Sequence, residues 1–137
     1  MTTGALLLFA AIVVAVAIGV VLRARRGKLR AARGVALPPE VLATLAGDVT
    51  LVMFTTEFCA NCKHTRPVLV DLVQQTSGLT YAEIDLTDKP ELAKQVAVLS
   101  TPTTLAVTAD GTEILRVGGV PEREELLAAM RPHLRVS

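Results

Sequence analysis

The sequence predicts an α/β protein: an open sandwich with a mixed central sheet and helices on both faces, preceded by one membrane-spanning helix. Three observations lead to this prediction. An uncharged apolar run opens the chain, strand-like and helix-like segments then follow in the order βαβαββα, and the chain's two cysteines come directly after an apolar strand-like segment. At 137 residues the chain has room for about one domain.

The apolar run spans residues 5–22 (ALLLFAAIVVAVAIGVVL). As a helix it would rise about 27 Å, close to the roughly 30 Å of a bilayer core. A cleaved signal peptide would carry positive charge before the run and a small-residue cleavage site after it, and the sequence shows neither. We therefore expect residues 1–22 to be an uncleaved transmembrane anchor.

Residues 23–36 are expected to be a basic linker. Six basic residues follow the run with no acid among them: Arg23, Arg25, Arg26, Lys28, Arg30 and Arg33. Because basic residues stay on the cytoplasmic side, we expect a single-pass protein of the cell membrane whose C-terminal domain lies in the cytoplasm. The linker could also touch anionic lipid head groups.

The charge of the remaining chain argues against nucleic-acid binding. From residue 35 onward the sequence has 8 basic and 13 acidic residues, a net charge of −5, although the whole chain carries +1. A nucleic-acid binder would be expected to carry positive charge on its folded part. We therefore expect no nucleic-acid partner.

Residues 37–137 are the expected domain, and its first two elements follow a Pro-Pro break. A short helix is expected over residues 40–45, with proline near its start. Residues 50–55 (TLVMFT) are continuously apolar and β-prone. Such a run is typical of a central strand that is buried on both faces.

The next three elements form the crossover part of the fold. From residue 59 to about 75, apolar residues recur at helical spacing and Pro67 interrupts them, which predicts one kinked helix. Residues 80–86 (TYAEIDL) alternate like a strand. A second, short helix is expected over residues 90–96, since Pro90 stands at its start.

The last three elements form a hairpin and a closing helix. Two strands are expected over residues 103–108 and 113–117, joined by a tight turn at Asp110 and Gly111. Residues 121–134 are expected to be a final amphipathic helix. The order requires a sheet with a parallel crossover followed by an antiparallel hairpin.

The cysteine pair, Cys59 and Cys62, lies at the expected start of the first helix of the domain. A spacing of three on a helix brings the two sulfurs to one face within bonding reach. The positive end of the helix dipole and its free N–H groups stabilise a thiolate and lower the pKa of the first cysteine. Cys59 is therefore the expected nucleophile, and Cys62 the resolving thiol that closes the disulfide and releases the partner.

Other uses of the two cysteines need residues that the chain lacks or places elsewhere. A structural zinc site needs four ligands, and the chain adds only His64 and His133. Covalent haem attachment needs a histidine directly after the second cysteine, where Lys63 stands. Two buried structural cysteines remain an alternative, weakened by their spacing at a helix start. We expect neither a metal nor a cofactor.

Residues 51–67 (LVMFTTEFCANCKHTRP) resemble the strand, active-site turn and kinked first helix of the thioredoxin family. The resemblance covers about residues 37–135 and implies a thioredoxin-like fold. More narrowly, the richness in Ala, Val and Arg resembles the small membrane-anchored thioredoxin-like proteins of actinobacteria.

The resemblance also implies a substrate site. Thr101 and Pro102 match the family's cis-proline loop, which would place Pro102 across from the disulfide and offer the backbone of Thr101 to a substrate strand. Gly118, followed by a second glycine, matches the close-approach glycine, where a side chain would obstruct docking. Phe58 takes the place of the family's tryptophan and is counted with these substrate-binding residues.

The family's acid-base relay is missing. Six residues before Cys59, thioredoxins usually carry a buried Asp that helps to deprotonate the resolving thiol, and Met53 stands there. The lysine that pairs with this Asp corresponds to Tyr81. Resolution by Cys62 is therefore expected to be slow near neutral pH unless Glu83 or water substitutes.

Two functions follow from these observations. The first is a cytoplasmic-face thiol-disulfide oxidoreductase, which reduces a protein or small-molecule disulfide on a membrane-associated partner such as an integral membrane protein. The second is a non-catalytic or regulatory accessory subunit of a membrane complex. We expect the first, and the loss of the relay and of the active-site tryptophan keeps the second as the alternative.

Overall fold

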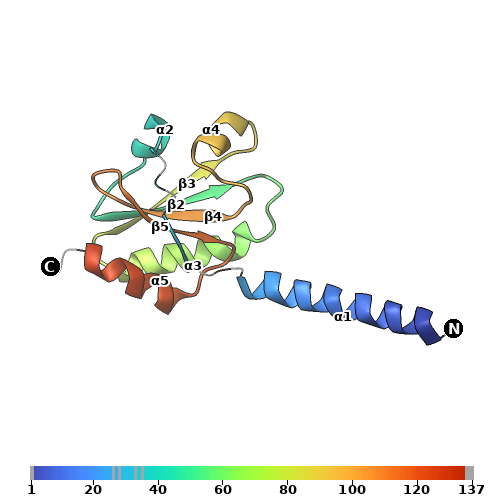
Figure 1. The fold of residues 1–137 in the computed structure, drawn as a ribbon. Coiled ribbons are helices and arrows are strands. Elements are labelled where there is room, and N and C mark those ends of the chain that lie inside the picture. The colour runs from blue at the N-terminus through green and yellow to red at the C-terminus, as the bar shows by residue number, and fades with distance from the viewer. Residues whose placement is uncertain (1, 26, 28, 33, 35, 135–137) are drawn as a thin grey trace.

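A five-stranded mixed sheet forms the centre of the domain (Figure 1). The computed structural model describes residues 2–25, 27, 29–32, 34 and 36–134. The strands are β1 (Leu29–Ala31), β2 (Val49–Thr55), β3 (Leu79–Asp85), β4 (Thr103–Thr108) and β5 (Glu113–Gly118). They lie in the order β1-β5-β4-β2-β3, with β2 and β3 parallel and the other pairs antiparallel. The parallel crossover and the hairpin are those that the sequence predicts.

Helices cover both faces of the sheet (Figure 1). One face carries α2 (Pro39–Leu42) and α4 (Pro90–Gln95), and the other carries α3 (Cys62–Gln75) and α5 (Arg123–Met130). The sheet therefore separates two apolar clusters, one under each pair of helices. This arrangement confirms the predicted α/β sandwich.

Strand β2 is buried along its whole length because both of its faces are covered. Leu51 and Met53 pack in the cluster under α3 and α5, whereas Val52 and Phe54 pack in the cluster under α2 and α4. The continuous apolar run of the sequence is thus explained. The strand ends at Thr55, and the turn that follows leads to α3.

The first helix, α1 (Thr2–Arg25), projects from the domain as a single rod (Figure 1). None of its residues is buried. By length and composition it is apolar enough to cross a membrane.

Three elements differ from the sequence-based expectation. Strand β1 lies inside the segment expected to be a linker and pairs with β5 through Leu29, opposite Val117. Helix α3 begins at Cys62, so Cys59 belongs to the preceding turn. The closing helix ends at Met130 and continues as a 3₁₀ turn, Arg131–His133, because Pro132 has no N–H group and clashes with the α-helical carbonyl four residues earlier.

Candidate active site

A disulfide between Cys59 and Cys62 lies beyond the end of β2, with an S–S distance of 2.19 Å and 5.5 Å between the Cα atoms. Cys62 opens α3 and its side chain is only 2% exposed, in the same apolar cluster as Met53. Cys59 is half-buried in the turn before the helix. Cys59 is therefore the more accessible of the two sulfurs.

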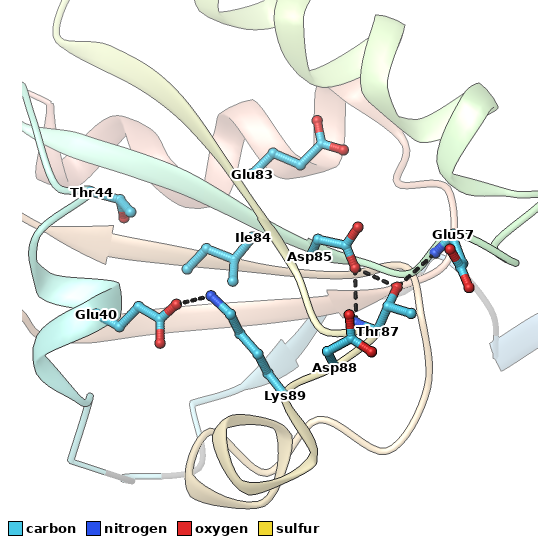
Figure 2. A pocket seen from close by; sticks show the side chains of 9 residues that line it. All are labelled: Glu40, Thr44, Glu57, Glu83, Ile84, Asp85, Thr87, Asp88 and Lys89. Carbon is cyan, nitrogen blue, oxygen red and sulfur yellow. Dashed lines mark hydrogen bonds and ion pairs between the residues drawn. The ribbon is translucent and has the colours of Figure 1, made fainter.

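Thr87 holds the turn in front of Cys59 (Figure 2). The backbone N–H of Glu57 donates to Thr87 Oγ1 at 3.0 Å. The hydroxyl and the N–H of Thr87 both donate to Asp85 Oδ1, at 2.5 and 2.8 Å. These bonds lower the pKa of Asp85 and keep its carboxylate charged. The loop after β3 is thus hydrogen-bonded to the turn that precedes Cys59.

Thr101 and Pro102 lie in the loop directly before β4, and the peptide bond between them is cis. Pro102 is buried, and its carbonyl accepts a hydrogen bond of 2.9 Å from the N–H of Gly119. The hydroxyls of Thr56 and Thr101 lie 3.4 Å apart, which joins this loop to the turn before Cys59. The loops after β2, before β4 and after β5 therefore meet at one edge of the sheet.

A groove runs along this edge. Its lining from the domain consists of Asn61, Ala97, Leu99, Ser100, Thr101, Pro102, Thr103, Arg116, Gly118 and Gly119. Two large apolar side chains near this edge are exposed to solvent: Phe58 and Leu99 are each 86% exposed. Phe58 directly precedes Cys59 in the chain, and Leu99 lines the groove.

Leu99 is not among the substrate-binding residues that the sequence predicts. Nothing in the local pattern separates it from the buried Leu and Val residues nearby, and its exposure depends on the path of the loop before Pro102.

Arg116 supports the same loop from inside the sheet. Its guanidinium contacts Glu113 Oε1 through Nε at 2.8 Å and through Nη2 at 2.5 Å, and the two side chains are 5% and 3% exposed. Its Nη1 donates to the carbonyls of Val96 and Ala97, each at 3.1 Å. Arg116 therefore ties β5 to the end of α4, just ahead of the segment that carries Leu99 and the cis-proline loop.

Gly118 leaves open space at the groove. A Cβ atom built on Gly118 meets no heavy atom within 4 Å beyond its chain neighbours. We expect Gly118→Val to change the free energy of unfolding by less than about 1 kcal/mol, because the new side chain enters no packed region. It would occupy the groove instead, so reduction of a protein disulfide should fall by roughly tenfold, about 1.4 kcal/mol of barrier.

Parallel rate measurements on a small aromatic disulfide and on a disulfide-bonded protein check this expectation. The small substrate serves as the control, since it needs less of the groove. An unchanged rate on the protein substrate would mean that docking does not pass over Gly118.

The register of β2 and β3 corrects the expected counterpart of the relay lysine. Met53 pairs with Glu83, whereas Tyr81 pairs with Leu51. Glu83, and not Tyr81, is thus the neighbour of Met53 across the strands. One more polar group lies opposite Met53 on β4: the buried hydroxyl of Thr104, the one buried side-chain oxygen or nitrogen of the described residues without a hydrogen-bond partner.

Glu83 is engaged by other groups. Arg66 donates to its two carboxylate oxygens, at 2.9 Å from Nε and 2.5 Å from Nη2, and Tyr81 Oη donates to it at 2.9 Å. The bond from Arg66 lowers the pKa of Glu83, while burial and the bond to Glu83 raise the pKa of Tyr81 to about 12. A carboxylate with a lowered pKa is a poor proton acceptor at neutral pH, which argues against Glu83 as the substitute base.

The lowered pKa of Glu83 predicts a pH-dependent contribution to stability. A group whose pKa is lower in the folded state stabilises the fold above its unfolded pKa, here 4.5, and this contribution is lost as the pH falls through the folded pKa. We therefore expect Glu83→Gln to destabilise the protein at pH 7 and to lose this effect toward pH 3. Urea unfolding of both proteins across that range measures the difference. A difference that stays constant with pH would contradict the ion pair.

The histidines do not join the cysteines. His64 and His133 are both exposed, and no group of three His, Cys, Asp or Glu side chains within the described residues is placed to hold a metal ion. In the acidic hollow of Figure 2, Glu40 contacts Lys89, and Asp85 accepts a hydrogen bond from Thr87. Figure 2 also shows Glu83 on the opposite side of its strand from Ile84 and Lys89.

The fold and the site together define a thiol-disulfide exchange protein: a CxxC pair at the start of a helix on a mixed sheet, with a cis-proline loop that contacts the turn before the pair. Comparison with known proteins agrees. Residues 40–132 match the family model described as Thioredoxin. The chain belongs to the thioredoxin family, and it is a thiol-disulfide oxidoreductase of that family.

Individual thioredoxins are similar to this chain over a comparable share of its length. Thioredoxin from Chlamydia caviae is 33% identical over 89 residues, which cover 65% of this chain and 86% of the relative. Thioredoxin from Mycobacterium tuberculosis is 35% identical over 92 residues, 62% of this chain and 78% of the relative. Among solved structures, a mutant thioredoxin from Halobacterium salinarum is 25% identical, with a TM-score of 0.58 over 66% of this chain and 79% of that one. The family-model match begins at residue 40 and leaves α1 outside.

Proposed function

We propose that this protein is a membrane-tethered disulfide reductase in which Cys59 is the nucleophile and Cys62 the resolving thiol. The observation that carries the proposal is the unequal burial of the pair: Cys59 is half-buried in the turn before α3, two residues from Asn61 of the groove, and Cys62 is 2% exposed. A sulfur that a substrate can reach performs the first attack, and a shielded sulfur one turn deeper attacks only the mixed disulfide.

The reaction starts from the reduced pair. The thiolate of Cys59 attacks one sulfur of the substrate disulfide, the substrate S–S bond breaks, and the other substrate sulfur leaves as a thiolate that takes up a proton. Cys62 then loses its proton and attacks Cys59 Sγ, which forms the Cys59–Cys62 disulfide and releases the second substrate thiol. Two electrons pass to the substrate, so a reductase or a small thiol must reduce the pair again.

The residues around Cys62 set the rate of the second step. Met53 occupies the place of a buried carboxylate, and the ion-paired Glu83 is a poor acceptor. The proton of Cys62 therefore passes to solvent, and resolution should speed up as the pH rises toward the pKa of the thiol.

We further propose that α1 is an uncleaved anchor and that the domain lies in the cytoplasm. The basic residues that follow the apolar run support this side, because positive charge stays in the cytoplasm. The cytoplasm also keeps thiols reduced, which suits a reductase. A C-terminal fusion to a reporter that is active only in the cytoplasm tests the topology. Activity of a periplasm-specific reporter instead would overturn both the topology and the reducing role.

A second candidate function is an accessory subunit of a membrane complex whose disulfide is idle or regulatory. Met53 favours it, since turnover benefits from a proton acceptor that a thioether cannot supply. Multiple turnovers on a model disulfide separate the two candidates. The accessory subunit would show none above the uncatalysed rate.

A further inference from the structure

The end of α1 is attached directly to the active-site edge. The helix ends at Arg25, and the N–H of Gly27 donates to the carbonyl of Gly118 at 2.7 Å. Strand β1 follows at Leu29 and pairs with the end of β5. A single residue of the chain separates Arg25, the end of the anchor, from Gly27, which is hydrogen-bonded to Gly118 of the groove. With at most about 3.6 Å of chain per residue, the anchor has little freedom to move away from this edge.

Residues of the anchor and of the segment after it complete the groove. Leu22, Arg25 and Arg30 line the same groove as Pro102 and the glycines. An adjoining hollow is lined by Gly19, Leu22, Arg23, Asn61, Gly119 and Val120. Leu22 is the last residue of the apolar run, so in a tethered chain this end of the groove lies at the bilayer surface.

Gly27 makes this close approach possible. A Cβ atom there would lie 2.3 Å from the carbonyl oxygen of Val120, and the residue has φ +76°. Gly34 also has a positive φ, +68°, yet a Cβ atom there meets nothing within 4 Å. Positive φ is costly for any side chain, so the two glycines differ mainly in the contact that only Gly27 makes.

We infer that the groove is held against the membrane and serves disulfides in the juxtamembrane segments of other membrane proteins, within the first few residues outside the bilayer. This inference rests on the proposed reductase function and names its substrate class. Arg25 and Arg30 favour the same placement, because basic side chains at the surface are attracted to anionic head groups. A disulfide held far from the bilayer surface would meet the groove less often.

The test uses the full-length chain in vesicles that contain anionic lipid, with single-span peptides as substrates. One peptide carries a disulfide loop about three residues from its span, and the other carries the same loop on a helical spacer of about 20 residues, roughly 30 Å long. We expect the near loop to be reduced about tenfold faster, because its effective concentration at the groove is higher. A flexible insertion of about 15 residues after Arg25 should remove the preference, since it releases the domain from the anchor.

Two glycine variants provide the matched comparison. Gly27→Val should reduce the near-to-far ratio toward one, whereas Gly34→Val should keep it. Equal rates on the two loops for the wild type, or a preference that survives the insertion, would overturn the inference and leave the reductase proposal standing. Failure of the wild type to reduce a small soluble disulfide would overturn the reductase proposal, and the inference with it.

A second measurement reports the placement without any turnover. A fluorophore on Cys59 in a Cys62→Ser chain should be quenched by a nitroxide on the lipid head groups more strongly than one at Asp110→Cys in a chain with both native cysteines replaced by serine. Asp110 lies in the turn between β4 and β5, beyond the end of β5 that is opposite Gly118, and the 6 residues of β5 span about 20 Å at roughly 3.3 Å per residue. Equal quenching at the two positions would contradict a groove that faces the bilayer.

Discussion

Replacement of Cys62 by serine is expected to trap the substrate. Cys59 remains partly exposed in the turn before α3 and can still attack, but the mixed disulfide has no buried thiol to resolve it. Covalent adducts should therefore accumulate at least about a hundredfold over the wild type, in line with the loss of a group that acts directly in the reaction. Membranes quenched with an alkylating reagent and separated without reductant would show the adducts.

Cys59→Ser is the matched control for this trap. It removes the exposed sulfur and leaves only Cys62, which is 2% exposed, so adducts should be absent. Equal trapping by the two variants would contradict the assigned order of attack. Adducts confined to proteins outside the membrane fraction would contradict a membrane-associated partner.

The largest effect on stability is expected from Arg116→Met. This change leaves the Glu113 carboxylate buried without the guanidinium that now contacts it, and it removes the bonds to the carbonyls of Val96 and Ala97. Breaking a buried ion pair from one side costs roughly 3–5 kcal/mol. Chemical unfolding of the full chain in micelles should show this loss.

A second variant and an exposed pair control for other causes. Arg116→Met combined with Glu113→Gln should be less destabilising than Arg116→Met alone, because the buried charge is gone. Arg123→Met breaks the pair with Asp71, whose side chains are 40% and 41% exposed, and should cost about 1 kcal/mol or less. A comparable loss for Arg116→Met and Arg123→Met would contradict the role assigned to burial.

The parts of the fold that the sequence predicts are those encoded by local patterns. The apolar run of β2, the spacing of Cys59 and Cys62 and the proline at residue 102 each carry their signal within a few residues. The structure confirms the mixed sheet, the parallel crossover and the cysteine pair at the end of β2.

Strand β1 had no such signal. It has three residues, of which two are exposed, and it exists because β5 offers it a free edge far along the chain. The sequence therefore did not predict that the end of the anchor is attached to the groove. It also means that a soluble version of the domain should begin before Gly27.

The buried pair of Glu113 and Arg116 was hidden for a different reason. In a regular strand, residues three apart point to opposite faces. Here the pairing of β4 with β5 shifts between Ala106 and Val107, so that Val107 lies opposite Glu113 and Leu105 opposite Arg116. Because of this irregularity, both charged side chains lie on one face of the sheet. No local pattern in the sequence predicts the irregularity.

The proposal that this protein reduces disulfides is tested most directly by turnover of insulin, a disulfide-bonded protein, with the full-length chain in micelles and a small thiol as electron donor. We expect the wild type to reduce many insulin molecules per chain, at a rate that rises with pH as Cys62 loses its proton more readily, and Cys59→Ser to match the uncatalysed rate. A folded wild type whose rate equals that of Cys59→Ser would contradict the proposal, and the accessory role would then be the function that the structure supports.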